Sequence, residues 1–375
     1  MLIEIHMMKN YPPTNLNRDD TGSPKSCTFG GFRRGRISSQ CLKRSWRISP
    51  LYESLLPERG IRTRKLPELV AEELRQRGIS DDVIQAISGK VTGIANKEGK
   101  ESPDGITSQM IFYSPEDVKA VADLMQEEFK KAGSIKAFAT IKAKDLVKQF
   151  NDVAVRPITL DMALFGRMVT SDAFRNIEAA MQVAHAISTH TVNQESDYFT
   201  AMDDLVSGAD SDDSGAGMIG DVDYNSSCYY HYASVDMNQL SENLKDAPNR
   251  DQLMEMLIPA LIKVIAFTNP SGKQNSFAGN VLPCMMMVEI KEDPIPVSYV
   301  NAFAKPARTG NGRSLIENSI DKFIDEIDTV DTAFDIPCYR VFFAPGYDRC
   351  PENAGKTVTL NELIEKSCAA VQASR

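Results

Sequence analysis

The chain lacks the sequence patterns that mark several common classes of protein. Its seven cysteines are odd in number, scattered and without a CxxC pair, so neither a disulfide framework nor a zinc ribbon is indicated. No apolar run is long enough to cross a bilayer, and the start, MLIEIHMMKNYPP, does not read as a signal peptide. There is no Walker A motif, no GxSxG and no dinucleotide fingerprint. We therefore expect a cytoplasmic protein with no cofactor, no metal and no membrane partner.

What the chain does contain is an uneven distribution of charge. Its 375 residues suffice for two or three domains, and its 25% charged and 42% apolar residues are typical of a globular protein. The net charge is −9, yet the stretch Asn15–Arg47 opposes eight basic residues with only Asp19 and Asp20, a local charge of +6. A concentrated positive field in an acidic chain predicts a polyanionic partner. The eight residues are Arg18, Lys25, Arg33, Arg34, Arg36, Lys43, Arg44 and Arg47.

The local sequence around these residues predicts how they are displayed. Ser38 is a good helix N-cap, and helix-forming residues follow as far as about Arg47. Upstream, three glycines (Gly30, Gly31 and Gly35) allow the backbone to approach a ligand closely. A helix here would place Cys41, Leu42, Ser45 and Trp46 on one side and Gln40, Lys43, Arg44 and Arg47 on the other. A lone helix of this kind would be read as a solvated amphipathic helix. With the neighbouring charges and glycines, the stretch favours binding of a nucleic-acid backbone.

The same residues carry a resemblance to a known family. NLNRDD at Asn15–Asp20 and FGGFRRGRISSQCLKRSWR at Phe29–Arg47 resemble the N-terminus of CasC, the repeated backbone subunit of type I-E CRISPR Cascade complexes. Three later segments agree in order: DMALFGRM, AHAISTH and DYFTAMDDL, beginning at Asp161, Ala184 and Asp197. The resemblance extends to the loop near Lys273 and is weak beyond it. Long, colinear motifs of this kind are improbable by chance.

The resemblance implies an α+β fold shaped like a hand. An RRM-like (ferredoxin-like) palm would comprise residues 1–50, 155–192 and 225–375, with mainly helical fingers at 51–154 and a thumb loop or hairpin at 193–224. From the residues alone, the segment from Asn193 to Tyr224 reads as a long acidic loop rich in glycine and serine. Strands near both ends of the chain, separated by helical sequence, also indicate an α+β protein with a discontinuous main domain.

The resemblance also implies partners and contact residues. The partners would be CRISPR guide RNA (crRNA), target DNA, other Cascade subunits and copies of this chain in a head-to-tail filament. Besides the basic stretch with Ser38 and Gln40, the RNA contacts would include Arg167, Met168, Lys273 and Gln274. Tyr198, Phe199 and Met202 would form a thumb that wedges between bases, since apolar side chains can replace a lost base stack. Without the resemblance, these three read as local packing residues.

A second basic cluster lies in the helical region. We expect Lys136, Lys142 and Lys144 to contact DNA if the resemblance holds, although lysines of this kind also occur on ordinary solvated helices. The expected elements are strands at Leu2–Met8, Met181–Thr191, Ser227–Asp236, Val281–Ile290 and Tyr339–Phe343. Helices are expected from Pro67, from Ser80 to just before Gly89, from Ser114, over Gln252–Thr268 and from Thr359.

An alternative function is a metal-dependent RNase that uses Asp19 and Asp20, because phosphodiester cleavage often employs carboxylate-held metal ions. Adjacent carboxylates beside Arg18 are more typical of a turn or of an arginine partner. His185 and His190 differ in strand parity, which argues against a histidine ligand pair. Type I-E backbone subunits leave cleavage to a separate nuclease, so we expect a non-catalytic protein.

Overall fold

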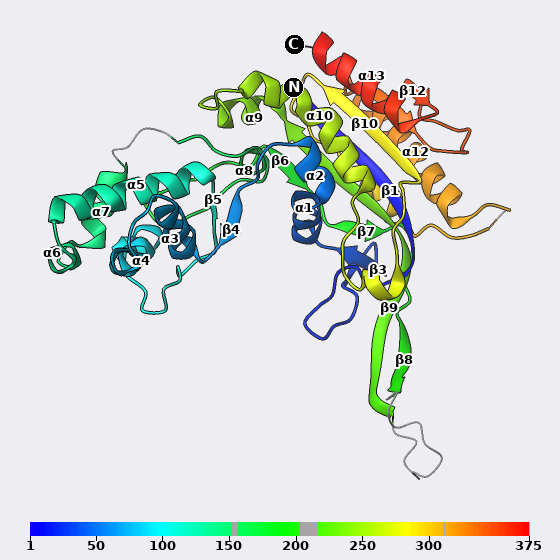
Figure 1. The fold of residues 1–375 in the computed structure, drawn as a ribbon. Coiled ribbons are helices and arrows are strands. Elements are labelled where there is room, and N and C mark those ends of the chain that lie inside the picture. The colour runs from blue at the N-terminus through cyan, green and yellow to red at the C-terminus, as the bar shows by residue number, and fades with distance from the viewer. Residues whose placement is uncertain (152–155, 203–215, 311, 375) are drawn as a thin grey trace, which may run out of the picture. The chain divides into compact units, whose positions relative to one another are not determined.

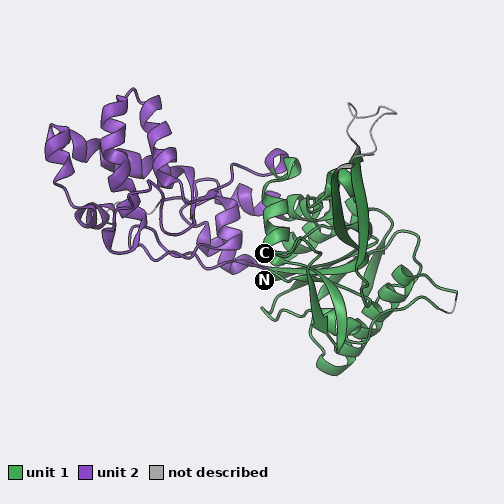
Figure 2. Cartoon of the chain, turned by 90° about the horizontal axis from the view of Figure 1, so that it is seen from below, with its two compact units in different colours: residues 1–52, 183–234, 258–375 green, residues 53–182, 235–257 purple. Residues whose placement is uncertain are grey.

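The computed structural model describes residues 1–151, 156–202, 216–310 and 312–374. The chain divides into two compact units, shown in Figure 2: unit 1 contains Met1–Tyr52, Val183–Ser234 and Ile258–Arg375, and unit 2 contains Glu53–Gln182 and Val235–Leu257. The expected fingers, 51–154, thus lie almost wholly in unit 2, which also includes 156–182 and 235–257. The expected boundary at 154/155 falls outside the described residues.

Unit 1 is built on a large, mostly antiparallel sheet (Figure 1). Its main path runs β12-β11-β10-β1-β9-β7-β3-β2, with β1 at the centre paired to β10 from Leu2↔Lys291 to Met8↔Met285. The β11–β12 pair is parallel. The strands are β1 Leu2–Thr14, β2 Ser26–Phe29, β3 Phe32–Ile37, β6 Met181–Val183, β7 Ala186–Ser188, β8 Glu195–Met202, β9 Ala216–Asp236, β10 Met285–Lys291, β11 Tyr339–Phe343 and β12 Ala354–Thr357.

Alternation along β1 directs its side chains to two different layers. Met8 packs in a core that includes Phe323 and Ile327 of α12, so this face of the sheet is covered by α12. Tyr11 has the opposite parity, and its hydroxyl donates to Asn269 just beyond the end of α10. The helical elements with residues in unit 1 are α1 Ser39–Arg47, α2 Pro50–Leu55, α10 Arg250–Phe267, α11 Gln274–Phe277, η2 Tyr299–Phe303, α12 Leu315–Phe334 and α13 Leu360–Ala373.

Unit 2 is mainly helical and has its own apolar core. Leu66, Val70 and Leu74 recur at helical spacing and are buried against residues such as Val91 and Val121. Its helical elements include α3 Leu66–Gln76, α4 Asp81–Ala95, η1 Lys97–Gly99, α5 Pro115–Ala132, α6 Ile135–Ala139, α7 Ala143–Asn151, α8 Leu160–Phe165 and α9 Met237–Asn243, with a short β4–β5 pair, Ile61–Thr63 and Ile111–Tyr113. None of the helices that the structure describes combines the length and apolar character needed to cross a bilayer.

Most expected elements are present, with three differences. The second helix of unit 2 does not end before Gly89; α4 continues to Ala95. The strand expected at Met181–Thr191 is two short strands, β6 and β7. The segment that read as a long loop contains strand β8, paired antiparallel with the first part of β9 from Glu195↔Tyr224 to Met202↔Ala216. Residues 203–215, between β8 and β9 in the sequence, lie outside the described residues.

Candidate nucleic-acid interface

The part of the basic stretch between β1 and β2, residues 15–25, is called the basic loop below. Asn17 links this loop to the start of helix α1. Its side-chain oxygen accepts a hydrogen bond from the Ser38 backbone N–H (2.8 Å), and its carbonyl accepts one from Lys25 N–H (2.8 Å). The Lys25 carbonyl in turn accepts from the Arg36 N–H (2.9 Å). The loop, strand β3 and helix α1 are therefore held together by the backbone and one amide side chain. The sequence reading did not identify Asn17, although it lies within the motif NLNRDD.

Helix α1 has the cap and the two faces that its sequence predicts. The Ser38 hydroxyl accepts a hydrogen bond from Cys41 N–H (3.3 Å), which confirms the N-cap. Leu42 and Trp46 are buried, whereas Gln40 and Arg44 are exposed. Lys43 and Arg47 are half-buried and interact within the protein. The exposed face of α1 is thus available to a ligand mainly through Gln40 and Arg44.

A groove of about 490 Å³ lies between the basic loop, α1 and the loop that follows α10. Its charged lining residues are Arg18, Arg44, Asp19 and Asp20. Neither arginine side chain has a hydrogen bond or ion pair to another described residue. The third wall contains Ser271 and Gly272. A Cβ on Gly272 would lie 2.4 Å from the Leu16 carbonyl oxygen, so only glycine permits this loop to pack so closely. The glycine in PSGKQNS was the sequence signal for this wall.

Three positive charges of the basic stretch act on His185. An Arg36 guanidinium nitrogen lies 3.0 Å from His185 Nδ1. Burial lowers the pKa of His185, and the charges of Arg36, Lys25 and Lys43 lower it further. These three basic side chains, from the loop, β3 and α1, therefore lie within electrostatic reach of one histidine. The lowered pKa favours neutral His185, so this histidine adds no positive charge to that of the three basic side chains.

Asp19 has a local structural role at the tip of the basic loop. Its carboxylate accepts hydrogen bonds from the Thr21 N–H (3.0 Å), the Thr21 hydroxyl (2.7 Å) and the Ser23 N–H (3.0 Å). The hydrogen bond from the Thr21 hydroxyl is the main cause of the lowered pKa of Asp19. This is the geometry of a turn-forming aspartate, and it matches the structural interpretation of the Asp19–Asp20 pair.

Two of the predicted RNA-contacting arginines are buried instead. Arg34 is fully buried, and its guanidinium donates to the carbonyls of Ser188 (3.1 Å) and Phe303 (2.5 Å). Arg167 in unit 2 is also buried and pairs with Asp117 (2.6 Å). Both guanidinium groups are committed to the interior, so the structure corrects their placement at the surface. Arg33, the neighbour of Arg34, is exposed and donates to Gln194 (3.0 Å).

The predicted wedge residues are placed on the surface of their own units. Met168 is 89% exposed in unit 2, although its neighbour Arg167 is buried. On the β8–β9 hairpin Tyr198 is 66% exposed, whereas Phe199 is half-buried and pairs in register with Gly220. A Cβ on Gly220 would lie 2.7 Å from the Phe199 ring, so this glycine makes room for the aromatic side chain. The side chain of Met202 lies outside the described residues.

The predicted DNA-contacting lysines, Lys136, Lys142 and Lys144, are all exposed in unit 2. Lys142 and Lys144 contribute to a hollow of about 410 Å³, which Lys90 and Glu101 also line. Lys90 is paired with Glu101 (2.7 Å). The hollow thus presents two lysines whose side chains have no ion pair among the described residues.

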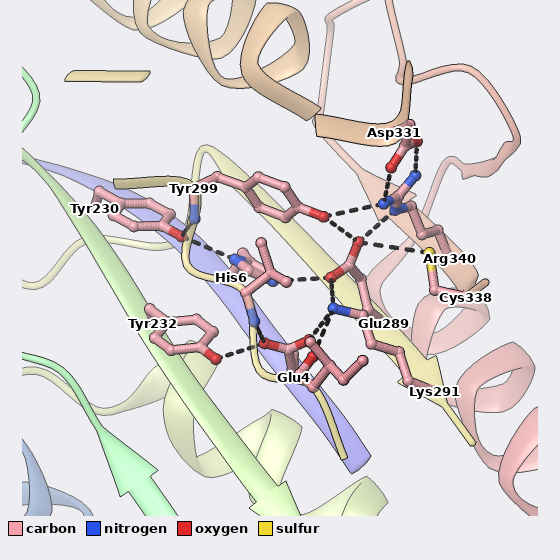
Figure 3. Close-up of polar contacts among 12 residues, drawn as sticks. Glu4, His6, Tyr230, Tyr232, Glu289, Lys291, Tyr299, Asp331, Cys338 and Arg340 are labelled. Atoms are coloured by element: carbon pink, nitrogen blue, oxygen red, sulfur yellow. Dashed lines mark hydrogen bonds and ion pairs between the residues drawn. The ribbon is translucent and has the colours of Figure 1, made fainter. Parts of the chain in front are cut away.

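A third cluster of ionisable groups is buried in unit 1, between the sheet and α12 (Figure 3). Glu4 and Glu289 face each other in register on β1 and β10, and Lys291 contacts both carboxylates. His6 Nε2 lies 3.4 Å from Glu289, and Arg340 joins Glu289 to Asp331. Burial would raise the pKa of Glu289, but His6, Arg340 and Lys291 outweigh burial and lower it far below the usual range.

This network has the ligand types of a metal site but not the charge balance of one. The oxygen and nitrogen atoms of Glu4, His6 and Glu289 lie within 4.8 Å of one another. The Lys291 ammonium already contacts the carboxylates of Glu4 and Glu289, as Figure 3 shows, and supplies the positive charge a metal would bring. A cation would have to displace this buried lysine. The arrangement therefore fits an internal salt-bridge network rather than a metal centre.

The fold and the groove together define a class of α+β protein that has a polar groove, lined in part by two arginines, in the unit that contains the large sheet. Residues 3–366 match the family model described as CT1975-like protein, and the chain belongs to this family of Cas proteins. This confirms the family-level resemblance to a Cascade backbone protein. No curated protein sequence matches the chain significantly.

Two solved structures share the fold. A chain of a "CRISPR RNA-guided surveillance complex, pre-nicking" is 24% identical with a TM-score of 0.82, and the alignment covers 99% of this chain and 100% of that chain. A chain of a "CRISPR RNA-guided surveillance complex" is 21% identical with a TM-score of 0.73, with the same coverage. The large mixed sheet with its helices is thus the fold of a surveillance-complex subunit.

Proposed function

We propose that this protein is a non-catalytic backbone subunit of a type I-E Cascade complex that binds crRNA through its sugar–phosphate backbone. The observation that carries the proposal is the groove in unit 1, where Arg18 and Arg44 have no side-chain partner among the described residues. Lys25, Lys43 and Arg47 belong to the same basic stretch and add to its positive charge. Backbone contacts position a nucleic acid without reading its sequence, as a subunit that must accept any guide requires.

The topology supports an RRM-like palm. Four neighbouring strands have the order β10-β1-β9-β7. Helix α1 lies between β1 and β7 in the chain, and α10 lies between β9 and β10. Counted along the chain, β1, β7, β9 and β10 form a βαββαβ series with the spatial order 4-1-3-2, the arrangement of ferredoxin-like folds. The extra strands β2, β3, β11 and β12 extend the sheet at its two ends.

The same proposal assigns partners and roles to the outlying residues. Copies of the chain would associate head to tail along the RNA with other Cascade subunits, because a heterologous contact builds an open filament. Met168, Tyr198 and Phe199 would displace bases at a regular interval while target DNA pairs with the guide, which their surface placement allows. Lys136, Lys142 and Lys144 would contact DNA. A panel of single mismatches tests the wedge, because tolerated mismatches should recur periodically along the guide.

The turn-forming role of Asp19 counts against the RNase alternative. Cleavage of RNA that requires Mg²⁺ and is lost on replacing Asp20 would restore it.

Substitution of Arg44 tests the groove directly. Arg44→Ala should weaken binding to single-stranded RNAs of unrelated sequence equally, by about fivefold at 0.1 M salt. It should also reduce the slope of log affinity against log salt by about 0.7, the value for one lost phosphate contact. Fluorescence anisotropy at several salt concentrations measures both quantities. Lys366→Ala is the control, because it removes an exposed charge from α13.

A loss confined to some RNA sequences, or an unchanged slope for Arg44→Ala, would contradict backbone binding in this groove. The identity of the RNA needs a second measurement: the protein purified together with its partner subunits should retain a discrete small RNA derived from CRISPR repeats.

A further inference from the structure

The segment 270–280, between α10 and β10, contains the short helix α11, and the residues that flank this helix have a backbone conformation that their sequence alone disfavours. We refer to this segment as the 270–280 loop. Lys273 (φ 54°) and Ala278 (φ 47°) both adopt the left-handed region, which residues other than glycine rarely occupy. Such conformations persist only where surrounding contacts impose them, and they are frequent at functional sites. The Lys273 side chain is half-exposed and has no hydrogen bond or ion pair to the rest of the described protein. Something must therefore hold this loop in place.

Asn269 closes the loop at its base. Its side-chain Nδ2 donates to the carbonyl of Val281 (3.2 Å), so one side chain joins the residues on either side of 270–280. Its Oδ1 accepts from the Tyr11 hydroxyl (2.7 Å) and the Lys9 ammonium (3.0 Å), both on the central strand β1. Lys9 also donates to the Thr268 carbonyl (3.0 Å) at the end of α10.

Lys9, which donates a hydrogen bond to Asn269, is a buried charge without a carboxylate partner among the described residues. Lys9 is fully buried, and burial lowers its pKa to about 7. Its titratable neighbours include Tyr11 on β1 and His231 on β9, and among the described residues no carboxylate forms an ion pair with it. Its partners are two oxygen atoms at a helix C-terminus, where a positive charge is favoured by the helix dipole. A lysine with these contacts holds the Asn269 oxygen directly.

Two glycines then seat the loop against the strand that leads into the basic segment. Gly272 packs on the carbonyl oxygens of Asn15 and Leu16, where a Cβ would lie at 2.7 and 2.4 Å. Gly279 packs on Thr14, where a Cβ would lie 2.4 Å from the side-chain methyl. The loop thus contributes Ser271 and Gly272 to the groove that Arg18 and Arg44 also line.

We propose that Asn269, held by Lys9 and Tyr11, is a positioning residue of the groove: it keeps the 270–280 loop in its strained conformation and so presents Lys273 to a phosphate. This inference rests on the proposed RNA-binding function and adds a residue that makes no contact with RNA itself. Asn269 is uncharged, so replacing it removes no charge from the groove.

The test is a pair of substitutions analysed together. With oligouridylate as the probe, Lys273→Met should lower the salt slope of binding by about 0.7. Asn269→Ala should produce the same reduction although no charge is removed, and the double variant should show no further loss. Hydrogen exchange of the Ala278 amide, which donates to Gln274 (2.7 Å), should accelerate in Asn269→Ala.

The matched control is Asn96→Ala in unit 2, where a buried asparagine also ties a loop through hydrogen bonds to Lys100 (2.8 Å) and Ser108 (2.7 Å). It should bind with the wild-type slope. If Asn269→Ala has the wild-type salt slope, or if the reductions in slope add in the double variant, Asn269 does not position Lys273. The proposed RNA binding would still stand. Failure of the wild type to bind oligouridylate overturns the proposed function. In that case the exchange measurement still tests the role of Asn269, because an unchanged exchange rate of the Ala278 amide in Asn269→Ala would show that Asn269 does not hold the loop.

Discussion

At the scale of single residues, neighbouring arginines of the same sequence motif have different roles. Arg34→Met should reduce the free energy of unfolding by about 1–3 kcal/mol, because the carbonyls of Ser188 and Phe303 lose a buried donor. The salt slope of RNA binding should stay at the wild-type value, since this guanidinium does not reach the surface. Urea unfolding and anisotropy measure the two effects. A slope reduced as in Arg44→Ala would show that Arg34 contacts RNA after all.

Lys9 makes stability depend on pH in a predictable direction. In the unfolded chain lysine keeps its proton up to a pKa near 10.5, whereas in the folded protein burial lowers the pKa of Lys9 to about 7. Between these values the unfolded state binds more protons, so the free energy of unfolding rises with pH, by up to about 1.4 kcal/mol per unit. Lys9→Met should remove this dependence. Urea unfolding at pH 6.5–9 tests it.

The comparison variant is Lys263→Met, which removes a half-buried lysine from α10 that has no polar partner among the described residues. Its stability should follow pH as the wild type does. If Lys9→Met and the wild type gave parallel curves, the lowered pKa of Lys9 would be refuted.

At the scale of elements, shortening the β8–β9 hairpin tests whether it is needed for folding or for the association of copies along RNA. Its base is tied to the basic loop, because Asp223 accepts hydrogen bonds from Ser23 (2.5 Å) and Gln194 (2.6 Å). Replacing 197–221 by a short glycine linker keeps these contacts. The shortened protein should fold and bind a short RNA, but fail to line up along a long one if the hairpin reaches the next subunit.

Mass photometry on long and short RNAs measures this difference in stoichiometry. Unfolding of the shortened protein would show that the hairpin belongs to the core. An unchanged number of copies on long RNA would remove the proposed role in assembly.

Helix α4 shows why local sequence does not determine where an element ends. Gly89 predicts the end of the helix, because glycine weakens helices. The helix continues through Gly89 to Ala95, and a Cβ on Gly93 would lie 2.4 Å from the Cβ of Ala143. Gly93 is therefore needed for close packing of α4 against the start of α7. Packing partners decide whether a glycine ends a helix or lets another helix approach, and the local sequence does not contain them.

At the scale of the whole chain, the buried charge network joins several elements of unit 1. Lys291→Met would leave the facing carboxylates of Glu4 and Glu289 without the ammonium between them. Removing one partner of a buried ion pair costs about 3–5 kcal/mol, so the free energy of unfolding should fall by that amount. Chemical unfolding measures it, with the exposed Lys366→Met as the control. A change as small as that of the control would show that the network does not stabilise unit 1.

The same network should make the free energy of unfolding decrease at acidic pH. The pKa of Glu289 is lowered in the folded state, so its contribution is present above the pKa of an unfolded glutamate and is lost as pH falls toward the folded value.

Local sequence was sufficient for features that depend on neighbours along the chain. The Ser38 cap, the capping boxes at Ser114 and Thr359 and the two faces of α1 follow from residues a few positions apart, and all are present. The charge of the basic stretch likewise needs only a count. The family was also recognisable from linear motifs, because those motifs are long and colinear.

Only the tertiary structure decided which of those charges reach a ligand. Arg33 and Arg34 are adjacent in the same motif, yet one is exposed and the other is enclosed by carbonyls from Ser188 and Phe303, far away in sequence. The third wall of the groove likewise depends on Asn269 and Gly272 meeting the end of β1. Burial and long-range hydrogen bonds arise between segments that the chain brings together on folding, so no local pattern could specify them.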